Sequence, residues 1–251
     1  MQKVMSITSI CPLLKEPSYQ HEMISQLLFG EQAELLEETE TFARIKCLND
    51  NYEGWCLNNQ LAKINPASVF ILKGFINKPS AVAFLNNSPV QLPLATPVYE
   101  NIDNGHYKLH YPHNNFLPVE GIATNSVTAL EIAMSFLNTA YIWGGKSSYG
   151  IDCSGLTQQI MKLMGITLPR DAYQQVTKGE TVDFLQAAHC GDLAFFDNEA
   201  GEIIHVGMLL DNNTIIHASG YVKIDAIDNF GITNSITGKR SHRLRIIKRF
   251  F

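Results

Sequence analysis

Long apolar runs are missing from this 251-residue sequence. No segment approaches the roughly 18 uninterrupted apolar residues that a membrane-spanning helix needs. Residues 1–12 contain neither the apolar core nor the small-residue cleavage site of a secretory signal. We therefore expect a cytoplasmic protein with no membrane partner, unless a leader segment has been removed.

Paired cysteines and a basic excess are missing as well. The cysteines are five in number and show no short paired spacing: Cys11, Cys47, Cys56, Cys153 and Cys190. Such a set argues against a disulfide framework and against a zinc knuckle. Lys and Arg number 19 against 24 Asp and Glu, and no long amphipathic helix concentrates the basic residues. The sequence therefore predicts no nucleic-acid partner.

What is present is enough apolar material, 45% of the residues, to build one to three compact units. Residues 1–60 alternate short apolar runs with polar turns, which predicts a small β-barrel. Its expected strands lie at 25–31, 33–38, 42–47 and, after an Asn-Asp-Asn turn at 49–51, up to Leu57. The glutamates of 31–40 are typical of a solvated strand face.

Residues 61–120 repeat this style, with short strands expected at 68–72, 81–85 and 91–99. The repetition predicts a second small barrel or a connecting domain. Turn-forming residues then predict a linker at Pro112, Asn114, Asn115 and Pro118.

From residue 125 the pattern becomes helical. A first helix is expected with Ser126 as its N-cap and with an apolar face made of Leu130, Ala133, Met134 and Leu137. A glycine-rich loop at 141–155 then delivers Cys153 to the first turn of a second helix, which Gly165 ends. The apolar positions of that helix are Leu156, Ile160, Leu163 and Met164. Free N–H groups and the positive dipole end at a helix start lower the pKa of a thiol, so we expect a reactive thiolate.

Two histidines follow on a predicted hairpin of strands at 203–210 and 214–219, after a buried strand at 191–196. If the three-residue loop sets the register, Gly207 lies opposite His217 and Leu210 opposite Thr214. His205 and His217 are then diagonal neighbours on one face, about 7–8 Å apart at the backbone. The charged final stretch, 243–251, is expected to be an edge strand.

A cysteine nucleophile needs a base, and the base needs a partner that orients its ring. Cys153, His205 and His217 fill these roles in the chain order of papain-like enzymes. Residues 167–175 are polar and are expected to line the same cleft. A zinc site of the same three residues lacks a fourth ligand at suitable spacing, although 189–192 offer candidates nearby. Each residue alone also permits a structural interpretation, as a buried cysteine or a core histidine.

Six motifs in the second half resemble, in order and spacing, the NlpC family of papain-like cell-wall peptidases. They are YIWGG at 141–145, DCSG at 152–155, LPR at 168–170, GDL at 191–193, HVG at 205–207 and IHA at 216–218. The front half is similar to the bacterial SH3-like barrels of the YkfC-type members. Here the matching stretches are EPS at 16–18, HEM at 21–23, QLLFGE at 26–31 and DNYEGW at 50–55.

The resemblance implies an α+β fold, in which a papain-like catalytic domain at 121–251 follows one or two SH3-like barrels at 1–60 and 61–120. It implies a γ-D-glutamyl-L-diamino acid endopeptidase that acts on murein peptides with a free N-terminal L-alanine and needs no cofactor. Cys153 is then the nucleophile, His205 the base and His217 the orienting residue.

For the substrate's amino end, the resemblance implies Tyr52, Asp152 and Ser154, with Glu22 and Tyr141 as further candidates. Without it, Asp152 could be a helix cap and Tyr52 a residue of the barrel core. Two other functions stay open: a related amidase or transpeptidase, and an inactive module that binds murein peptides. The presence of all three triad residues argues against the inactive module.

Overall fold

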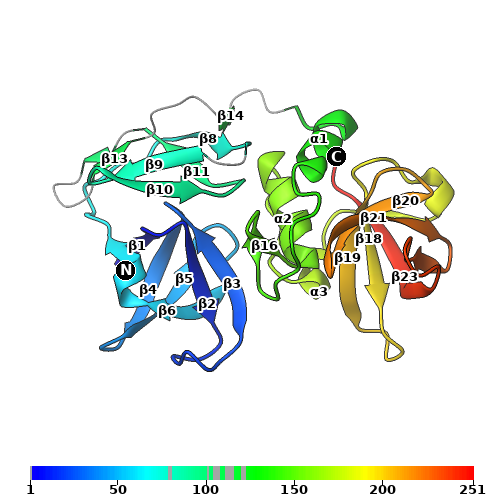
Figure 1. The fold of residues 1–251 in the computed structure, drawn as a ribbon, viewed down its shortest axis with the longest axis horizontal. Coiled ribbons are helices and arrows are strands. Elements are labelled where there is room, and N and C mark those ends of the chain that lie inside the picture. Colours follow the sequence, from blue (N-terminus) through cyan, green and yellow to red (C-terminus); the bar gives the residue numbers. More distant parts are fainter. Residues whose placement is uncertain (1, 79–80, 101, 104–107, 111–115, 120–122) are drawn as a thin grey trace. The chain divides into compact units, whose positions relative to one another are not determined.

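The computed structural model describes residues 2–78, 81–100, 102–103, 108–110, 116–119 and 123–251 (Figure 1). The chain divides into two compact units, 1–122 with 143–148 and 123–142 with 149–251. The first consists mainly of strands and the second combines helices with a sheet, so the predicted α+β class is confirmed. None of the helices in these ranges has the length and apolar character to span a membrane.

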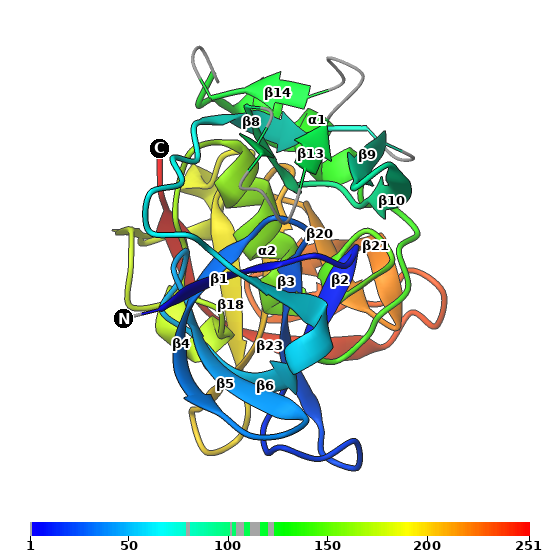
Figure 2. The same cartoon turned by 90° about the vertical axis from the view of Figure 1, so that its left-hand side faces the viewer.

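The first unit opens with a seven-stranded antiparallel sheet in the order β3-β2-β6-β5-β4-β1-β7, drawn in blue in Figure 2. Its strands are β1 Lys3–Ser6, β2 Ile10–Leu14, β3 Met23–Leu28, β4 Gln32–Glu38, β5 Phe42–Cys47, β6 Glu53–Leu57 and β7 Leu61–Lys63, with the 3₁₀ turn η1 Asn58–Gln60 before β7. The strands expected after residue 25 are present. The sequence pattern missed β1 and β2, because their four and five residues are too few to show an alternation.

Alternate residues of these strands fill the sheet's interior. Cys11, Cys47 and Cys56 belong to this apolar core, and all five cysteines of the chain are free thiols. The expected turn is confirmed by Asn51, whose φ of 60° is the left-handed geometry that asparagine tolerates. One expectation was wrong: Glu31 is buried rather than solvated, because its carboxylate pairs with the Lys146 ammonium at 3.3 Å.

Two smaller sheets follow, with strand orders β10-β9-β13-β12 and β11-β8-β14. Their bounds are β8 Leu72–Ile76, β9 Ala81–Leu85, β10 Ser88–Leu92, β11 Pro97–Tyr99, β12 Ile102–Asp103, β13 Lys108–His110 and β14 Phe116–Pro118. The expected strand at 81–85 is present, the one at 68–72 begins only at Leu72, and the one at 91–99 is split between β10 and β11. Of the predicted linker, Pro112, Asn114 and Asn115 lie outside the described residues, and Pro118 ends β14. The domain boundaries at 60 and 120 stay predictions.

The second unit begins with helix α1, Ser126–Met134. Its N-cap is Asn125, whose side chain accepts a hydrogen bond from the Thr128 backbone, and not Ser126 as expected. The expected apolar face was also wrong in part. Leu130 and Met134 are exposed, whereas Ala133 is buried together with Ala129 and Ile132. The buried face of α1 consists mainly of small alanines, so a prediction based on the larger apolar side chains chose the wrong face.

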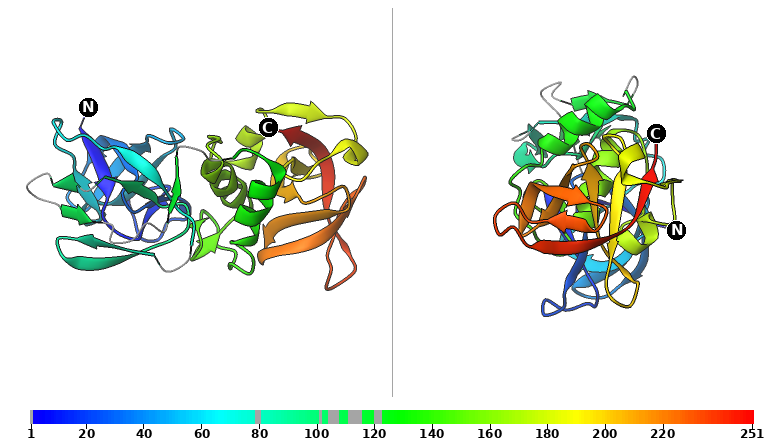
Figure 3. Two further views of the ribbon diagram at one scale, coloured as in Figure 1. Left: turned by 90° about the horizontal axis from the view of Figure 1, so that it is seen from above. Right: turned by 90° about the vertical axis from the view of Figure 1, so that its right-hand side faces the viewer.

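The strand β15, Lys146–Ser147, belongs to the first unit. The second unit continues with the short strand β16 Gly150–Ile151, the helices α2 Cys153–Leu163 and α3 Ala172–Gln175, and the 3₁₀ turn η2 Leu185–Ala187. Its sheet has the order β17-β23-β18-β19-β20-β21-β22 (Figures 1 and 3). The strands are β17 Glu180–Val182, β18 Leu193–Asp197, β19 Ile203–Leu209, β20 Thr214–Ser219, β21 Tyr221–Asp228, β22 Gly231–Thr233 and β23 Arg240–Arg249.

An additional pairing of β22 with β23 closes six of these strands into a barrel. The expectation that the C-terminal strand lies at an edge was therefore wrong. β23 is bonded on both sides, and its arginines instead pair with carboxylates of the same unit, such as Arg243 with Asp197 at 2.7 Å. Closure brings the interior faces of β19, β20, β21 and β23 together, and the candidate site lies there.

Candidate active site

Helix α2 begins at Cys153, as the sequence predicts. Asp152 is its N-cap, with extended backbone geometry and a side chain that accepts a hydrogen bond from the Gly155 N–H at 2.7 Å. The predicted apolar positions Leu156 and Ile160 are fully buried, and Gly165 follows the helix with a φ of +78°. Local signals in the chain thus suffice to place the sulfur at a helix start.

The resting state of the sulfur differs from the expectation. Burial raises the pKa of Cys153 to about 12, and the Asp152 carboxylate adds to the rise. Hydrogen bonds from the backbone N–H groups of Val206 and Ser154, and the charge of Arg170, act in the other direction but are outweighed. The prediction of a thiolate from the helix start alone was wrong, because desolvation disfavours the charge more than the helix end favours it. This thiol needs a base.

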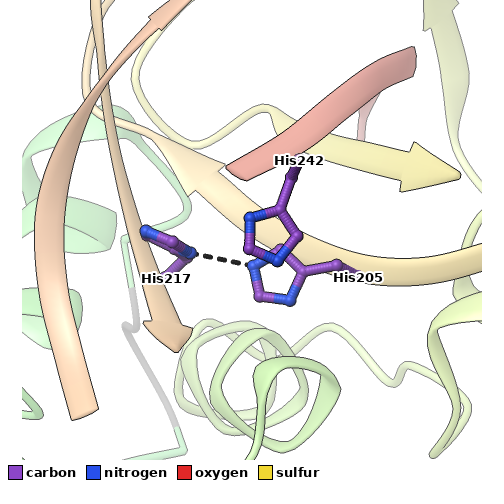
Figure 4. Close-up of side chains that lie close together, drawn as sticks. All are labelled: His205, His217 and His242. Atoms are coloured by element: carbon purple, nitrogen blue, oxygen red, sulfur yellow. Dashed lines mark hydrogen bonds between the residues drawn. The ribbon is translucent and has the colours of Figure 1, made fainter. Parts of the chain in front are cut away.

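The histidine hairpin has the predicted register. Met208 lies opposite Ile216 and Leu209 opposite Ile215, which places Gly207 opposite His217. A side chain at Gly207 would bring its Cβ within 2.8 Å of the Cβ of His217, so the glycine makes room for that ring. The predicted diagonal contact is present: Nε2 of His205 lies 2.8 Å from Nδ1 of His217 (Figure 4).

A carboxylate orders the protons of this pair. Nε2 of His217 lies 3.0 Å from Oδ2 of Asp225 on β21. Because an ionised carboxylate only accepts, Nε2 of His217 carries a hydrogen and its Nδ1 has the lone pair. That lone pair must accept from the Nε2–H of His205. The network therefore assigns His205 the tautomer in which Nδ1 is the free base, as a proton acceptor for a thiol requires.

Burial and hydrogen bonding keep both partners in the matching charge states. Burial lowers the pKa of His217, and it lowers the pKa of His205 well below 6.5, helped by the neighbouring His242 and His217. Burial acts to raise the pKa of Asp225, but hydrogen bonds from Ser235 and His217 outweigh it and hold that pKa at about 2. Neutral imidazoles therefore lie beside an ionised carboxylate at neutral pH.

A third histidine completes the cluster. His242 of β23 stacks on His205, with ring centroids 4.0 Å apart and an angle of 23° between the rings (Figure 4). Its Nδ1 lies 2.9 Å from the Ser241 hydroxyl. Burial and the nearby His217 lower the pKa of His242 to about 4. The proton relay from His205 to Asp225 does not pass through this ring.

Asp152 has a second task besides capping α2. The buried Arg170 guanidinium donates to both carboxylate oxygens, with Nη1 3.0 Å from Oδ1 and Nη2 2.6 Å from Oδ2. The same Nη1 also donates to the Ser154 hydroxyl at 3.0 Å. The predicted polar segment 167–175 thus packs on the start of α2. Its arginine holds two predicted substrate-binding residues in one cluster.

Tyr141 lies at the same end of α2. Burial, together with the nearby Cys153 and Asp152, raises the pKa of its hydroxyl above the usual 10, so the phenol is neutral and able to donate. Tyr52 and Glu22 belong to the first unit. Tyr52 packs partly against the apolar core of the seven-stranded sheet, and Glu22 is exposed and pairs with Lys15 at 3.3 Å. Their role in the site stays a prediction.

Comparison with known proteins places this geometry in a family. A sequence profile of the NlpC/P60 family matches residues 138–241, and a profile of the bacterial dipeptidyl-peptidase SH3 domain matches residues 13–61. The chain contains an NlpC/P60 domain. The predicted resemblance and the predicted papain-like fold with an SH3-like front domain are confirmed.

Two curated relatives and one solved structure are similar to this chain. The chain is 28% identical over 214 residues to gamma-D-glutamyl-L-lysine dipeptidyl-peptidase of Bacillus subtilis, covering 77% of this chain and 71% of that one. The Bacillus cereus protein of that name is 28% identical over 222 residues, at 77% and 65% coverage, so this chain spans just under two thirds of it. A crystal structure of an NlpC/P60 family protein from Bacillus cereus superposes with a TM-score of 0.83 at 20% identity, covering 98% and 99% of the two chains. The family profile and the two relatives support the predicted class of enzyme, a peptidase, and the solved structure supports the fold.

In the second unit, the sequence pattern missed Asp225, Arg170 and His242 as site residues. A signal for Asp225 was available. Lys223, Asp225 and Ile227 are inward-facing, alternate residues of β21, and two charges on the inner face of a strand are unusual. Arg170 lies in the segment 167–175 that was expected to line the cleft, but the pattern did not single it out. His242 gave no comparable signal, because it lies on no pattern that points to the histidine hairpin.

Proposed function

We propose that this chain is a cysteine endopeptidase that hydrolyses the bond between γ-D-glutamate and an L-diamino acid, diaminopimelate or lysine, in murein peptides with a free N-terminal L-alanine. The observation that carries the proposal is the relay of His205, His217 and Asp225 on the adjacent strands β19, β20 and β21. The first of these strands hydrogen-bonds the sulfur of the helix-start Cys153 through the Val206 N–H. Relatives named for γ-D-glutamyl-L-lysine cleavage support the choice of bond.

The reaction follows from the assigned tautomers. Nδ1 of His205 takes the thiol proton of Cys153, and the sulfur attacks the γ-carbonyl carbon of D-glutamate. The imidazolium then returns the proton to the nitrogen of the diamino acid as the C–N bond breaks, which leaves a thioester on Cys153. His205 next takes a proton from water, and the hydroxide attacks the thioester carbonyl. As the C–S bond breaks, the imidazolium returns that proton to the sulfur, which releases the L-Ala-D-Glu dipeptide and restores the thiol.

His217 and Asp225 support the cation that forms on His205. The positive charge created at each proton transfer is held through His217 by a carboxylate with a pKa of about 2, which stays ionised throughout. The backbone N–H of Val206, beside the base in sequence, hydrogen-bonds the sulfur and stabilises its thiolate. Cys153 therefore rests as a neutral thiol and becomes a thiolate only when His205 takes its proton during the reaction.

The amino end of the substrate is proposed to bind at the start of α2. A buried ammonium needs a carboxylate and neutral acceptors, because an unpaired buried charge costs several kcal/mol. Asp152, Ser154 and the Tyr141 hydroxyl supply such groups near Cys153. An N-acylated peptide lacks the ammonium, so we expect it to bind poorly. This selectivity suits a cytoplasmic enzyme that recycles released murein peptides.

The test compares kcat/KM for L-Ala-γ-D-Glu-L-Lys and its N-acetylated form, with products identified by mass spectrometry. Wild type should cleave the free peptide between D-Glu and L-Lys and cleave the acetylated one at least about 10-fold more slowly. Asp152→Asn should reduce this preference, and Asp228→Asn, in an exposed ion pair of the same unit, is the matched control. Equal rates on both peptides in wild type would overturn the amine selectivity, and no cleavage of either would overturn the bond assignment.

The residues that carry the reaction also serve a related amidase or transpeptidase, which differ only in what attacks the thioester. Adding a second amine to the assay separates these functions: hydrolysis gives the free dipeptide acid, whereas transfer gives a new amide. A Tyr52→Phe variant in the same assay tests the predicted contribution of the front barrel.

A further inference from the structure

Three histidines gather inside the barrel of the second unit, one each from β19, β20 and β23. Every one of them offers a ring nitrogen, and these nitrogens all lie within 4.8 Å of one another. His205 and His217 are buried and His242 is half-buried, so the cluster is reached from the side of His242. Cys153 is not a member of this group, so it differs from the cysteine-containing zinc site considered from the sequence.

The spacing suits a small metal ion. Nitrogens that coordinate tetrahedral zinc at 2.0–2.1 Å lie about 3.3 Å from one another. The His205 and His217 nitrogens are now 2.8 Å apart, and Figure 4 shows the His242 ring lying over the ring of His205. To reach zinc geometry, the first distance must open and the His242 ring must rotate out of its stack on His205, because the in-plane lone pairs of two rings inclined by only 23° do not meet at one ion.

The outer partners of such a site are already in place. A metal-binding histidine usually donates its other ring N–H to an oxygen, which fixes the ring. Nε2 of His217 is held by the Asp225 carboxylate at 3.0 Å, and Nδ1 of His242 lies 2.9 Å from the Ser241 hydroxyl. Two of the three rings therefore turn their remaining nitrogen toward the cluster.

We propose that Nε2 of His205, Nδ1 of His217 and Nε2 of His242 bind one Zn²⁺, with water as the fourth ligand, and that the bound zinc switches the peptidase off. Imidazole nitrogen is a ligand that zinc prefers. Coordination at Nε2 of His205 displaces the proton that this atom donates to His217, and the proton moves to Nδ1. With Nδ1 protonated, His205 cannot accept the thiol proton of Cys153.

Neighbouring charges leave the site close to neutral. The Lys223 ammonium is 3.3 Å from Oδ2 of Asp225, so the cation that would repel zinc is paired with a carboxylate that attracts it. Zinc binding is independent of the proposed function, whereas its inhibitory effect rests on that function.

The binding experiment uses the full chain after treatment with a chelator, titrated with ZnCl₂ in a calorimeter. Wild type and Cys153→Ser should each bind one zinc with similar affinity. His242→Phe keeps an aromatic ring against His205 but removes the nitrogen, and it should weaken binding at least about 10-fold. His242→Gln is a second variant if the first misfolds, and His189→Phe, an exposed histidine elsewhere in the same unit, is the control that should not change.

The inhibition experiment compares each variant with its own zinc-free activity. Wild type should lose cleavage at the zinc concentration that saturates the calorimetric site, and His242→Phe should need at least about 10-fold more zinc for the same loss. Zinc binding that Cys153→Ser abolishes and His242→Phe leaves intact would overturn the proposal in favour of a thiol-bound ion. Binding that His242→Phe weakens, without inhibition of an active wild type, would overturn the switch alone. A wild type without peptidase activity would refute the proposed function. The calorimetric titration would then decide by itself whether the zinc site exists.

Discussion

The two seven-stranded sheets of this protein have interiors of opposite character. The first sheet buries an apolar core with residues such as Cys11, Leu13 and Ile45. The second sheet turns His205, His217 and Asp225 inward on neighbouring strands. Burying polar groups is costly unless each finds a partner, and in the second sheet the partners come from adjacent strands. The same kind of sheet therefore encloses an apolar core in one unit and the candidate site in the other.

Ion pairs show the same contrast. Arg44 and Glu53 on the first sheet pair at 2.8 Å with both side chains exposed. Arg170 and Asp152 in the second unit pair at 2.6 Å, with side chains 1% and 9% exposed. Solvent screens the first pair and stabilises its members separately, whereas the buried partners depend on each other. Site residues should therefore respond to substitution more strongly than similar residues of the first sheet.

The largest expected contrast is between two buried cysteines. Cys153→Ala should lower kcat/KM on the free tripeptide by about 10⁴-fold or more, because it removes the atom that attacks. Cys56→Ala, in the core of the first sheet, should leave kcat/KM within about twofold, because that thiol packs in an apolar core and donates to the Ala43 carbonyl of the same sheet. Residual activity of Cys153→Ala near the wild-type level would show that another group attacks the substrate.

The next contrast is between two carboxylates of β21. Asp225→Asn should lower kcat/KM by about 10²- to 10⁴-fold, because an amide can donate to His217 and favour the wrong tautomer of both histidines. Asp228→Asn, at the exposed end of the strand where it pairs with Arg240, is the matched control and should keep its activity. Equal activity of the two variants would refute the assigned relay.

A third contrast concerns stability. Arg170→Met leaves the Asp152 carboxylate buried without its cation, so the free energy of unfolding should fall by about 3–5 kcal/mol. Arg44→Met in the exposed pair should cost less than about 1 kcal/mol. Urea unfolding followed by circular dichroism measures both. The double variant Arg170→Met/Asp152→Asn removes the unpaired charge as well. If its free energy of unfolding is no higher than that of Arg170→Met alone, the loss of stability does not come from that charge.

The smallest expected effect is on the pH profile. A base acts when neutral, and burial, with His242, His217 and Lys223, lowers the pKa of His205 well below 6.5. Activity should therefore persist as the pH falls through 6.5 and decline only at lower pH, where His205 gains its proton. Lys223→Met removes one positive charge and should move this decline to higher pH by less than about one unit. The profile of kcat/KM is measured with a chelator present, and an unmoved or oppositely moved decline would contradict the assigned influence of Lys223.

Much of the site was predictable because its signals are short in range. The apolar spacing after Cys153 marks α2, and the three-residue loop before Thr214 fixes how the histidine strands pair. The failures have a common cause. The thiolate prediction counted the helix end but not the burial of the sulfur, and the edge-strand prediction for β23 read its charges without knowing its neighbours.

The sequence by itself determined that a cysteine starts a helix and that two histidines face each other across a hairpin, since residues a few positions apart are held together by backbone geometry. Only the tertiary structure decided what surrounds them. Asp225 reaches His217 through the pairing of β20 with β21, and His242 reaches His205 because the barrel closes. Arg170 meets Asp152 across 18 positions of the chain. Such contacts form only when strands and loops that are distant in the sequence pack around a shared interior. Burial in that interior shifts the pKa values of the site residues, and a local sequence pattern does not show how deeply a residue is buried.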